Sequence, residues 1–223
     1  MKNIFIASIL LFTIFACGGG SSKQEKPPMD GPHYVGDSIN FTKYLYKEGI
    51  VVSETPFVNN KAHGTAIDYF MNGNKRLTVE YKDAKRDGMS VSYYESGEKH
   101  GETPYVNGKI EGIKYIYKKD GSVTVKAPFE DGKPTPGLEE YDAEGKLIPQ
   151  PTIKFKMNGG TLRMELSDKS FTKVKFYHIT PKVMIEVPMS GNVGNLTQAT
   201  KGTKIRAYYS TPRGAEGAVD ATY

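Results

Sequence analysis

The sequence predicts an all-β protein: an elongated antiparallel meander of tandem 24-residue β-hairpin repeats, followed by a small β-sandwich-like C-terminal domain. Three observations predict this fold class. Aromatic and glycine residues recur at a step of 24 residues. Apolar and polar residues alternate between the glycines, as in half-buried strands. The alternation continues over residues 149–223, after the 24-residue register has stopped.

The composition agrees with strands joined by tight turns. Among 223 residues there are 24 glycines, 15 tyrosines and no tryptophan, and tyrosine and glycine favour strands and turns over helices. The formal net charge is only +5, and the basic residues are spread among acids. Because no run of like charge tracks a phosphate backbone, nucleic acid is not an expected partner.

Residues 1–17 form a targeting segment. Lys2 supplies a positive start, and the apolar run over residues 4–15 is too short to span a bilayer. The run ends in Ile14-Phe15-Ala16-Cys17, which resembles the lipobox of bacterial lipoproteins, although Phe15 departs from the usual small residue. The resemblance implies cleavage before Cys17 and acylation of that cysteine. A secretory signal with an incidental cysteine is the alternative.

Residues 18–37 are expected to form a flexible tether between the lipid and the fold. The segment opens on Gly18-Gly19-Gly20-Ser21-Ser22, and glycine and serine favour a flexible coil. Gly18 is not the aspartate that retains many bacterial lipoproteins in the inner membrane. The resemblance therefore implies a lipid-anchored protein of the cell envelope, in the outer membrane if the cell is Gram-negative, and either periplasmic or surface-exposed.

Residues 38–148 carry the repeat. Several positions hold the 24-residue step through successive units. One of them is a lysine, at Lys61, Lys85, Lys109 and Lys133. The repeat-defining residues are Tyr69, Tyr93, Tyr117 and Tyr141; Gly73, Gly97, Gly121 and Gly145; and Phe57, Tyr81, Tyr105 and Phe129. One hairpin alone cannot bury its aromatic face, so an array is expected.

Each repeat reads as one hairpin. A strand opened by Gly64 runs over residues 65–70, with Ile67 and Tyr69 on one face. Asn72-Gly73 supplies a turn, a second strand covers residues 75–81, and a longer return loop covers residues 83–88. A proline precedes the aromatic at Pro56, Pro104 and Pro128. Because proline donates no hydrogen bond to a ladder, strand pairing is expected to lapse there or to face solvent.

The pattern Gly-x4-aromatic-aromatic-x2-Gly, then an aromatic, Asn or Asp, Gly and Lys, resembles the MORN-type repeat. Its bacterial variant is often labelled the YwqK-like antitoxin family. The resemblance covers residues 40–147, and it departs at Asn60, Ala84 and Lys118. The label implies a possible immunity role, but the repeat itself carries no such chemistry.

Residues 149–223 are expected to form the β-sandwich-like domain, beginning at Pro149-Gln150-Pro151. Segments 153–157 and 161–166 flank Asn158-Gly159-Gly160, a strong hairpin signal. Segments 171–179, 183–187 and 204–209 also alternate, as strands of a sandwich do.

No enzyme is expected, and no cofactor or metal. The histidines His33, His63, His100 and His178 do not stand at metal-ligand spacing, and there is no second cysteine. No serine stands in a Gly-x-Ser-x-Gly elbow. Glu139 and Glu140 are neighbours at the start of a strand, so they point to opposite faces and cannot act as a catalytic pair.

The aromatic residues are the binding candidates. Five repeated tyrosines are expected to pack against one another as core: Tyr69, Tyr93, Tyr117, Tyr81 and Tyr105. On the other face, Tyr46, Phe70 and Tyr94 are expected to form a binding face, or equally to cover the C-terminal domain. The row of lysines is expected to block edge-to-edge pairing, with acidic lipid heads as a weaker possibility.

These expectations lead to one function class and two alternatives. The leading hypothesis is a lipid-anchored cell-envelope binding or scaffold protein, whose repeat sheet meets a protein or polysaccharide. An immunity protein that neutralises a toxin is the second hypothesis, and a hydrolase without a recognisable motif is the third. The sequence leaves the partner and the oligomeric state open.

Overall fold

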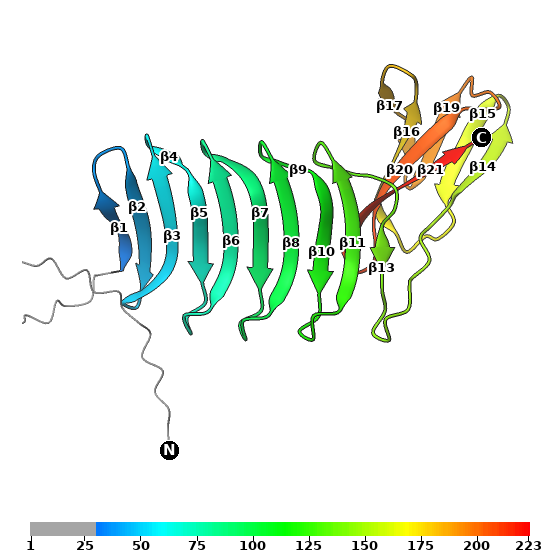
Figure 1. Ribbon diagram of the computed structural model, residues 1–223. Coiled ribbons are helices and arrows are strands. Elements are labelled where there is room, and N and C mark those ends of the chain that lie inside the picture. Colours follow the sequence, from blue (N-terminus) through cyan, green and yellow to red (C-terminus); the bar gives the residue numbers. More distant parts are fainter. Residues whose placement is uncertain (1–29) are drawn as a thin grey trace, which may run out of the picture.

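The computed structural model describes residues 30–223, which form strands, turns and loops and contain no helix (Figure 1). The predicted all-β class is confirmed. The signal segment 1–17, Cys17 and the first part of the predicted tether lie outside the described residues.

The repeats build one thirteen-stranded antiparallel sheet with the order β1-β2-β3-β5-β6-β7-β8-β10-β11-β12, beside which β4, β9 and β13 pair with β3, β8 and β11. Sequence neighbours are therefore spatial neighbours, as expected for a meander. Its strands are β1 (Gly31–Gly36), β2 (Phe41–Lys47), β3 (Ile50–Val58), β4 (Lys61–Ala62), β5 (Gly64–Tyr69), β6 (Lys75–Lys82), β7 (Lys85–Tyr93), β8 (Lys99–Val106), β9 (Lys109–Ile110), β10 (Gly112–Tyr117), β11 (Val123–Glu130), β12 (Lys133–Pro134) and β13 (Glu139–Glu140).

The turn inside each later hairpin follows the predicted pattern. Gly73 adopts a φ of 85°, a left-handed conformation that favours glycine, and its N–H donates to the Phe70 carbonyl at 2.9 Å. The side-chain oxygen of Asn72 accepts from the N–H of Asn74 at 2.9 Å. The sister glycines take the same role with positive φ angles at Gly97, Gly121 and Gly145.

The return loop is shorter than the sequence predicted. Asp83 and Ala84, with φ angles of 49° and 66°, form a two-residue turn, and Lys82 pairs with Lys85. The expected loop over residues 83–88 was therefore wrong, since β7 already begins at Lys85. The N–H of Ala84 donates to the carbonyl of Ala62 at 2.8 Å. This bond to the preceding unit holds the turn tightly enough to keep a residue other than glycine in the left-handed region.

The prolines divide the strands as expected. Opposite Pro56 and Pro104, the return segment is split into two pieces, β4 with β5 and β9 with β10. The repeat with Glu80 at the equivalent position keeps one strand, β7, along β6, although its register also shifts between Val79 and Tyr81. The unit with Glu80 thus keeps one pair, Val79 with Ser90, whose equivalent is missing in the units with proline, which cannot donate to the ladder.

The first hairpin differs from the others. Residues 31–36 had been assigned to the tether, but they form β1, which pairs along its whole length with β2. Glu48 and Gly49 make a two-residue turn with φ angles of 53° and 73°, where later hairpins use a longer loop. As a result Leu45, and not Tyr44, lies opposite Ser53, a shift of one residue relative to later repeats.

The C-terminal part consists of two four-stranded antiparallel sheets, β14-β15-β19-β18 and β17-β16-β20-β21. Gly194 of the first sheet lies so close to Met164 and Phe176 that an added Cβ would stand 2.8 Å and 2.9 Å from their side chains. The two sheets therefore pack closely, as in a sandwich. Their strands are β14 (Ile153–Asn158), β15 (Thr161–Leu166), β16 (Thr172–Ile179), β17 (Met184–Glu186), β18 (Met189–Ser190), β19 (Val193–Thr197), β20 (Lys204–Ser210) and β21 (Glu216–Thr222). The sequence analysis had not identified β18, β19 and β21.

The two parts share one hydrophobic core. Val125, Ala127 and Phe129 of β11 are buried in the same cluster as Phe176 and Ile205 of the sandwich. Elsewhere the repeat sheet is a single layer, and no described element covers either face between β1 and β8 (Figure 1). The core therefore lies at one end of the array, and the rest of the sheet presents two faces to solvent.

Candidate binding surface on the tyrosine face

Strand register separates the side chains of the sheet into two faces. The docked face is the one whose residues on β11 meet the C-terminal sandwich. The opposite face, here called the tyrosine face, follows one row of directly paired residues from strand to strand. The row contains Tyr44, Glu54, Ile67, Thr78, Val91, Glu102, Tyr115, Lys126 and Glu139.

The repeated tyrosines lie on this face beside the row, and two of them donate to glutamates of the preceding hairpin. The Tyr69 hydroxyl donates to Glu54 at 2.7 Å, and the Tyr117 hydroxyl donates to Glu102 at 2.6 Å. The two pairs are related by two repeats, which is four strands or about 20 Å along the sheet. They coincide with two nearly identical segments of sequence that begin at Glu54 and Glu102.

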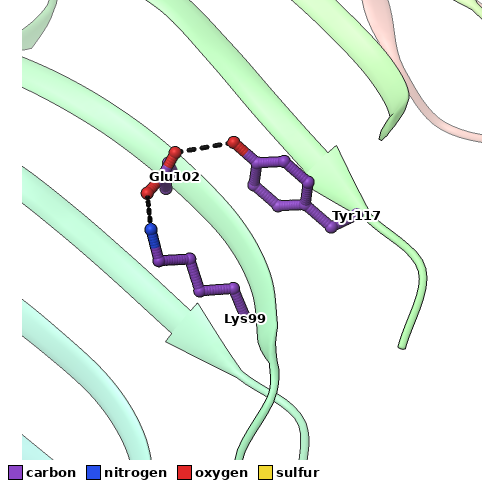
Figure 2. A network of polar contacts seen from close by, with 3 residues as sticks. All are labelled: Lys99, Glu102 and Tyr117. Atoms are coloured by element: carbon purple, nitrogen blue, oxygen red, sulfur yellow. Dashed lines mark hydrogen bonds and ion pairs between the residues drawn. The ribbon is translucent and has the colours of Figure 1, made fainter. Parts of the chain in front are cut away.

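The second pair belongs to a three-residue network (Figure 2). The Lys99 ammonium lies 2.5 Å from one oxygen of Glu102, and Tyr117 holds the other oxygen. Lys99 and Tyr117 together hold the pKa of the Glu102 carboxyl below its ordinary value. Burial, assisted by Glu102, raises the pKa of Tyr117 to about 12. At neutral pH the site therefore holds an ionised carboxylate and a neutral tyrosine in fixed positions.

The remaining tyrosines vary this arrangement. Tyr93 has no glutamate partner, because Thr78 stands where Glu54 and Glu102 stand in the neighbouring units. At the docked end, Tyr141 donates to Glu139, and the Lys126 ammonium lies 6.0 Å from the ring centre of Tyr141. Along this face, tyrosine rings with their hydroxyl groups therefore lie next to glutamate carboxylates.

The expectation that these tyrosines form a core was wrong. Tyr69, Tyr93 and Tyr117 are half-buried, not buried, and lie on a face without a covering layer, whereas the half-buried Tyr81 and Tyr105 lie on the opposite face. The buried apolar residues of the repeats, Val79 among them, lie on the docked face with Leu77 and Tyr81. A sheet one layer thick leaves both sets of side chains partly accessible.

The predicted binding residues do not share one face. Tyr46 lies on the tyrosine face with its ring edge-to-face against His33. Tyr94 follows the end of β7 and packs against His100, whose ring nitrogen lies 3.4 Å from Ser92 on the docked face. The cause is the short turn of the first hairpin, which shifts the register by one residue and so moves Tyr46 to the opposite face.

Tyr94 is also engaged in joining repeats. Its hydroxyl donates to the carbonyl of Tyr117 in the next unit at 2.7 Å. Lys118, at the same repeat position, donates to the carbonyl of Ala143 one unit further on, also at 2.7 Å. Phe70 precedes Tyr94 by one repeat and is likewise half-buried. This position therefore serves contacts between adjacent hairpins.

Sequence reasoning missed Glu54 and Glu102 as functional candidates. The signal was present, since both glutamates open the two nearly identical segments. For Tyr46 the signal was the spacing of aromatics: Tyr44 and Tyr46 alternate, whereas Tyr69 and Phe70 are adjacent. Alternating aromatics lie on one face of a strand, and adjacent ones do not.

Residues 30–223 were also compared with two other kinds of site, metal centres and membrane spans. They contain no group of three or more potential metal-ligating side chains. They likewise contain no helix long and apolar enough to cross a membrane. Lys61, Lys85, Lys109 and Lys133 each follow a two-residue turn and are exposed, with Lys109 paired to Asp131 of the next unit.

The tyrosine face has the chemistry of a surface for sugar rings. Tyrosine rings present apolar faces and a polar tip, and ionised carboxylates are strong hydrogen-bond acceptors. Hydroxyl-rich ligands with apolar C–H faces meet both requirements. The groups recur about every 10 Å, so the surface suits a ligand that is itself extended and repetitive.

The chain matches no protein-family model and no curated protein in sequence comparisons.

Proposed function

We propose that this chain is a lipid-anchored cell-envelope protein whose repeat sheet holds an extended polysaccharide on its tyrosine face. Anchoring rests on the lipobox-like segment that ends at Cys17. The ligand class rests on the periodic face, where half-buried tyrosines alternate with glutamates held ready as acceptors. The binding and scaffold roles then coincide, because the sandwich closes one end of the sheet and leaves this face accessible.

One observation carries the proposal. Glu54 and Glu102, two repeats apart, each accept a hydrogen bond from the equivalent tyrosine of the next hairpin. Both carboxylates are held by these hydrogen bonds on a face that no described element covers. Two acceptors about 20 Å apart, with Tyr93 between them, fit several consecutive sugars of one chain. Several weak contacts on one ligand add up to useful affinity.

The test is capture of envelope polysaccharides by the full chain, purified in detergent and immobilised. We expect retention of one class of polysaccharide by the wild type and loss of retention in the triple variant Tyr69→Ala, Tyr93→Ala, Tyr117→Ala. The matched control is Tyr81→Ala with Tyr105→Ala, which removes tyrosines from the docked face. Thermal unfolding of each variant verifies that the sheet has formed.

Two results contradict the proposal. Equal retention by the triple variant and the control means that the tyrosine face is not the site. Recovery of one protein in near-equal amount, with no polysaccharide, identifies a protein partner instead. If that protein is a toxin whose activity the chain suppresses, the immunity hypothesis replaces this one.

A further inference from the structure

We propose a second binding site, at the junction between the repeat sheet and the sandwich, whose ligand is an anionic sugar. A cavity of about 320 Å³ opens where β12 meets the outer face of β16 and β20. It is distinct from the tyrosine face and does not depend on the function proposed for that face. Its principal lining residues are Lys133, Lys173, Lys175, Tyr177, Tyr208 and Glu216.

Three lysines reach this cavity from two parts of the fold. Lys133 comes from the repeat side, directly after the two-residue turn at Asp131 and Gly132. Lys173 and Lys175 come from β16, on the sandwich side. Chain segments about 40 residues apart in sequence therefore deliver cations to one hollow.

Lys173 and Lys175 lie beside a local irregularity of β16. The register between β16 and β20 shifts between Thr172 and Lys175, and Lys173 has a φ of 52°. A long side chain rarely adopts this left-handed conformation. Such bulges redirect side chains, and many lie at functional sites. Lys173 and Lys175 stand on either side of the buried Val174, so the alternation of the strand directs both away from the core.

The charges around the cavity leave it positive. The Lys175 ammonium is partly neutralised by Glu186, at 3.1 Å, and Glu216 lines the cavity as an acid. Among the described residues, the ammonium groups of Lys133 and Lys173 have no close hydrogen-bond or ion-pair partner, although Lys133 contributes to lowering the pKa of Asp131. Asp131 precedes Lys133, but its carboxylate is already paired with Lys109. Two ammonium groups are therefore available to an anion.

The other lining groups select a sugar over a bare anion. Tyr177 and Tyr208 pack edge-to-face at 5.4 Å and are half-buried, so part of each ring is open. An aromatic ring accommodates the C–H face of a sugar, and Glu216 is an acceptor for its hydroxyls. A uronic acid and a sugar phosphate share this chemistry: an anionic group for the lysines and a hydroxylated ring for the rest.

The test is isothermal titration calorimetry of the full chain in detergent at low salt. The ligands are glucuronate, glucose 6-phosphate, glucose and inorganic phosphate. We expect binding of the anionic sugars and at least about tenfold weaker binding of glucose and of phosphate. Glucose lacks the anionic group that the lysines would bind, and phosphate lacks the hydroxylated ring. The two anionic sugars separate carboxylate from phosphate preference. Affinity should fall with added salt because the ammonium groups are exposed.

Two variants probe the two sides of the cavity. Lys133→Gln and Lys173→Asn are each expected to weaken binding of the anionic sugar about tenfold. Asparagine is chosen because it tolerates the left-handed backbone. Lys182→Gln, an exposed lysine in the β16–β17 turn, is the matched control and should bind as the wild type does. Unchanged melting temperatures without ligand show that both variants fold.

Several outcomes overturn the proposal. Absence of heat with both anionic sugars at millimolar concentration excludes the site. Phosphate binding as tight as the anionic sugars excludes the sugar as ligand. Equal affinity in the wild type, Lys133→Gln and Lys173→Asn places any binding elsewhere, and so does an equal loss in Lys182→Gln.

Discussion

Glu102 is a side chain of the tyrosine face with two hydrogen-bond partners. It accepts from Lys99 on its own strand and from Tyr117 on β10. Its side chain is 18% exposed, whereas that of Lys99 is 57% exposed. The lysine therefore contributes little as a surface ion pair, and the tyrosine hydrogen bond is the more protected of the two interactions.

We expect Glu102→Gln to lower stability by about 1 kcal/mol at pH 7, since a neutral amide is a weaker acceptor. The folded pKa of Glu102 lies below the ordinary value of 4.5. Its stabilisation is therefore complete above about pH 4.5, and it is lost as pH falls through the lowered folded pKa. Urea unfolding of wild type and variant at pH 7, 4.5 and 3 should show the difference shrinking. A constant difference, or an equal effect of Glu95→Gln, contradicts this account.

A second residue-scale prediction concerns Ala84. Its φ of 66° strains an alanine, and sister turns place Gly108 and Gly132 there. Ala84→Gly should therefore raise the free energy of unfolding by about 1 kcal/mol. Ala62→Gly, within β4, is the opposite control and should destabilise, because glycine is unfavourable in a strand. Chemical denaturation measures both, and a loss of stability in Ala84→Gly refutes the strain argument.

At the scale of the element, the ladder between neighbouring hairpins depends on proline. Pro56 and Pro104 accompany split strands, and Glu80 accompanies the continuous strand β7. The structure therefore contains the repeat both with the proline and without it.

We expect Glu80→Pro to keep the fold but to split β7 as β9 and β10 are split. Within residues 85–90, the amide of Ser90 should then exchange hydrogen about tenfold faster or more, since its pairing with Val79 is lost. The internal reference is the segment 109–114, which Pro104 already interrupts, and its rates should not change. Unaltered exchange over residues 85–90 means that proline does not control the ladder.

Much of this element structure was predictable from sequence. The 24-residue step located the hairpins, the glycine turns and the interruption at proline, because these depend on local backbone chemistry. The prediction that Ile67 and Asp68 lie on opposite faces of the sheet was also correct, because side chains alternate along a strand. The register of Tyr46 was not predicted, because a different turn in the first hairpin overrides the repeat. Burial of the tyrosines was misjudged because sequence does not show whether a second layer exists.

At the scale of the whole molecule, the sandwich closes one end of the array. Glu140 is buried and lies 3.4 Å from the Thr211 hydroxyl, and Arg213 donates to the Tyr141 carbonyl at 2.9 Å. Leu138 belongs to the common core. The repeats nearest the sandwich therefore gain a covering layer that the first repeats lack, and stability should increase towards that end.

Gly217→Ala should weaken the junction. An added Cβ would stand 2.8 Å from both Leu138 and Tyr209, a distance that forces one of them to move. We expect a loss of about 1–3 kcal/mol, measured by denaturation followed through tyrosine fluorescence. Thr222→Ala, exposed on the same strand, is the control. Wild-type stability of Gly217→Ala would show that the sheet and the sandwich do not share a rigid core.

The backbone bond from a return turn to the unit before it is the same at Ala84, Gly108 and Gly132, so the joints after the first hairpin are alike. Inserting or deleting one unit in the middle leaves both β1 and the closed end unchanged and alters the separation between them by about 10 Å. The number of hairpins therefore sets the distance between the two ends of the array. Gene duplication can lengthen its span in fixed steps, without any new joint having to evolve.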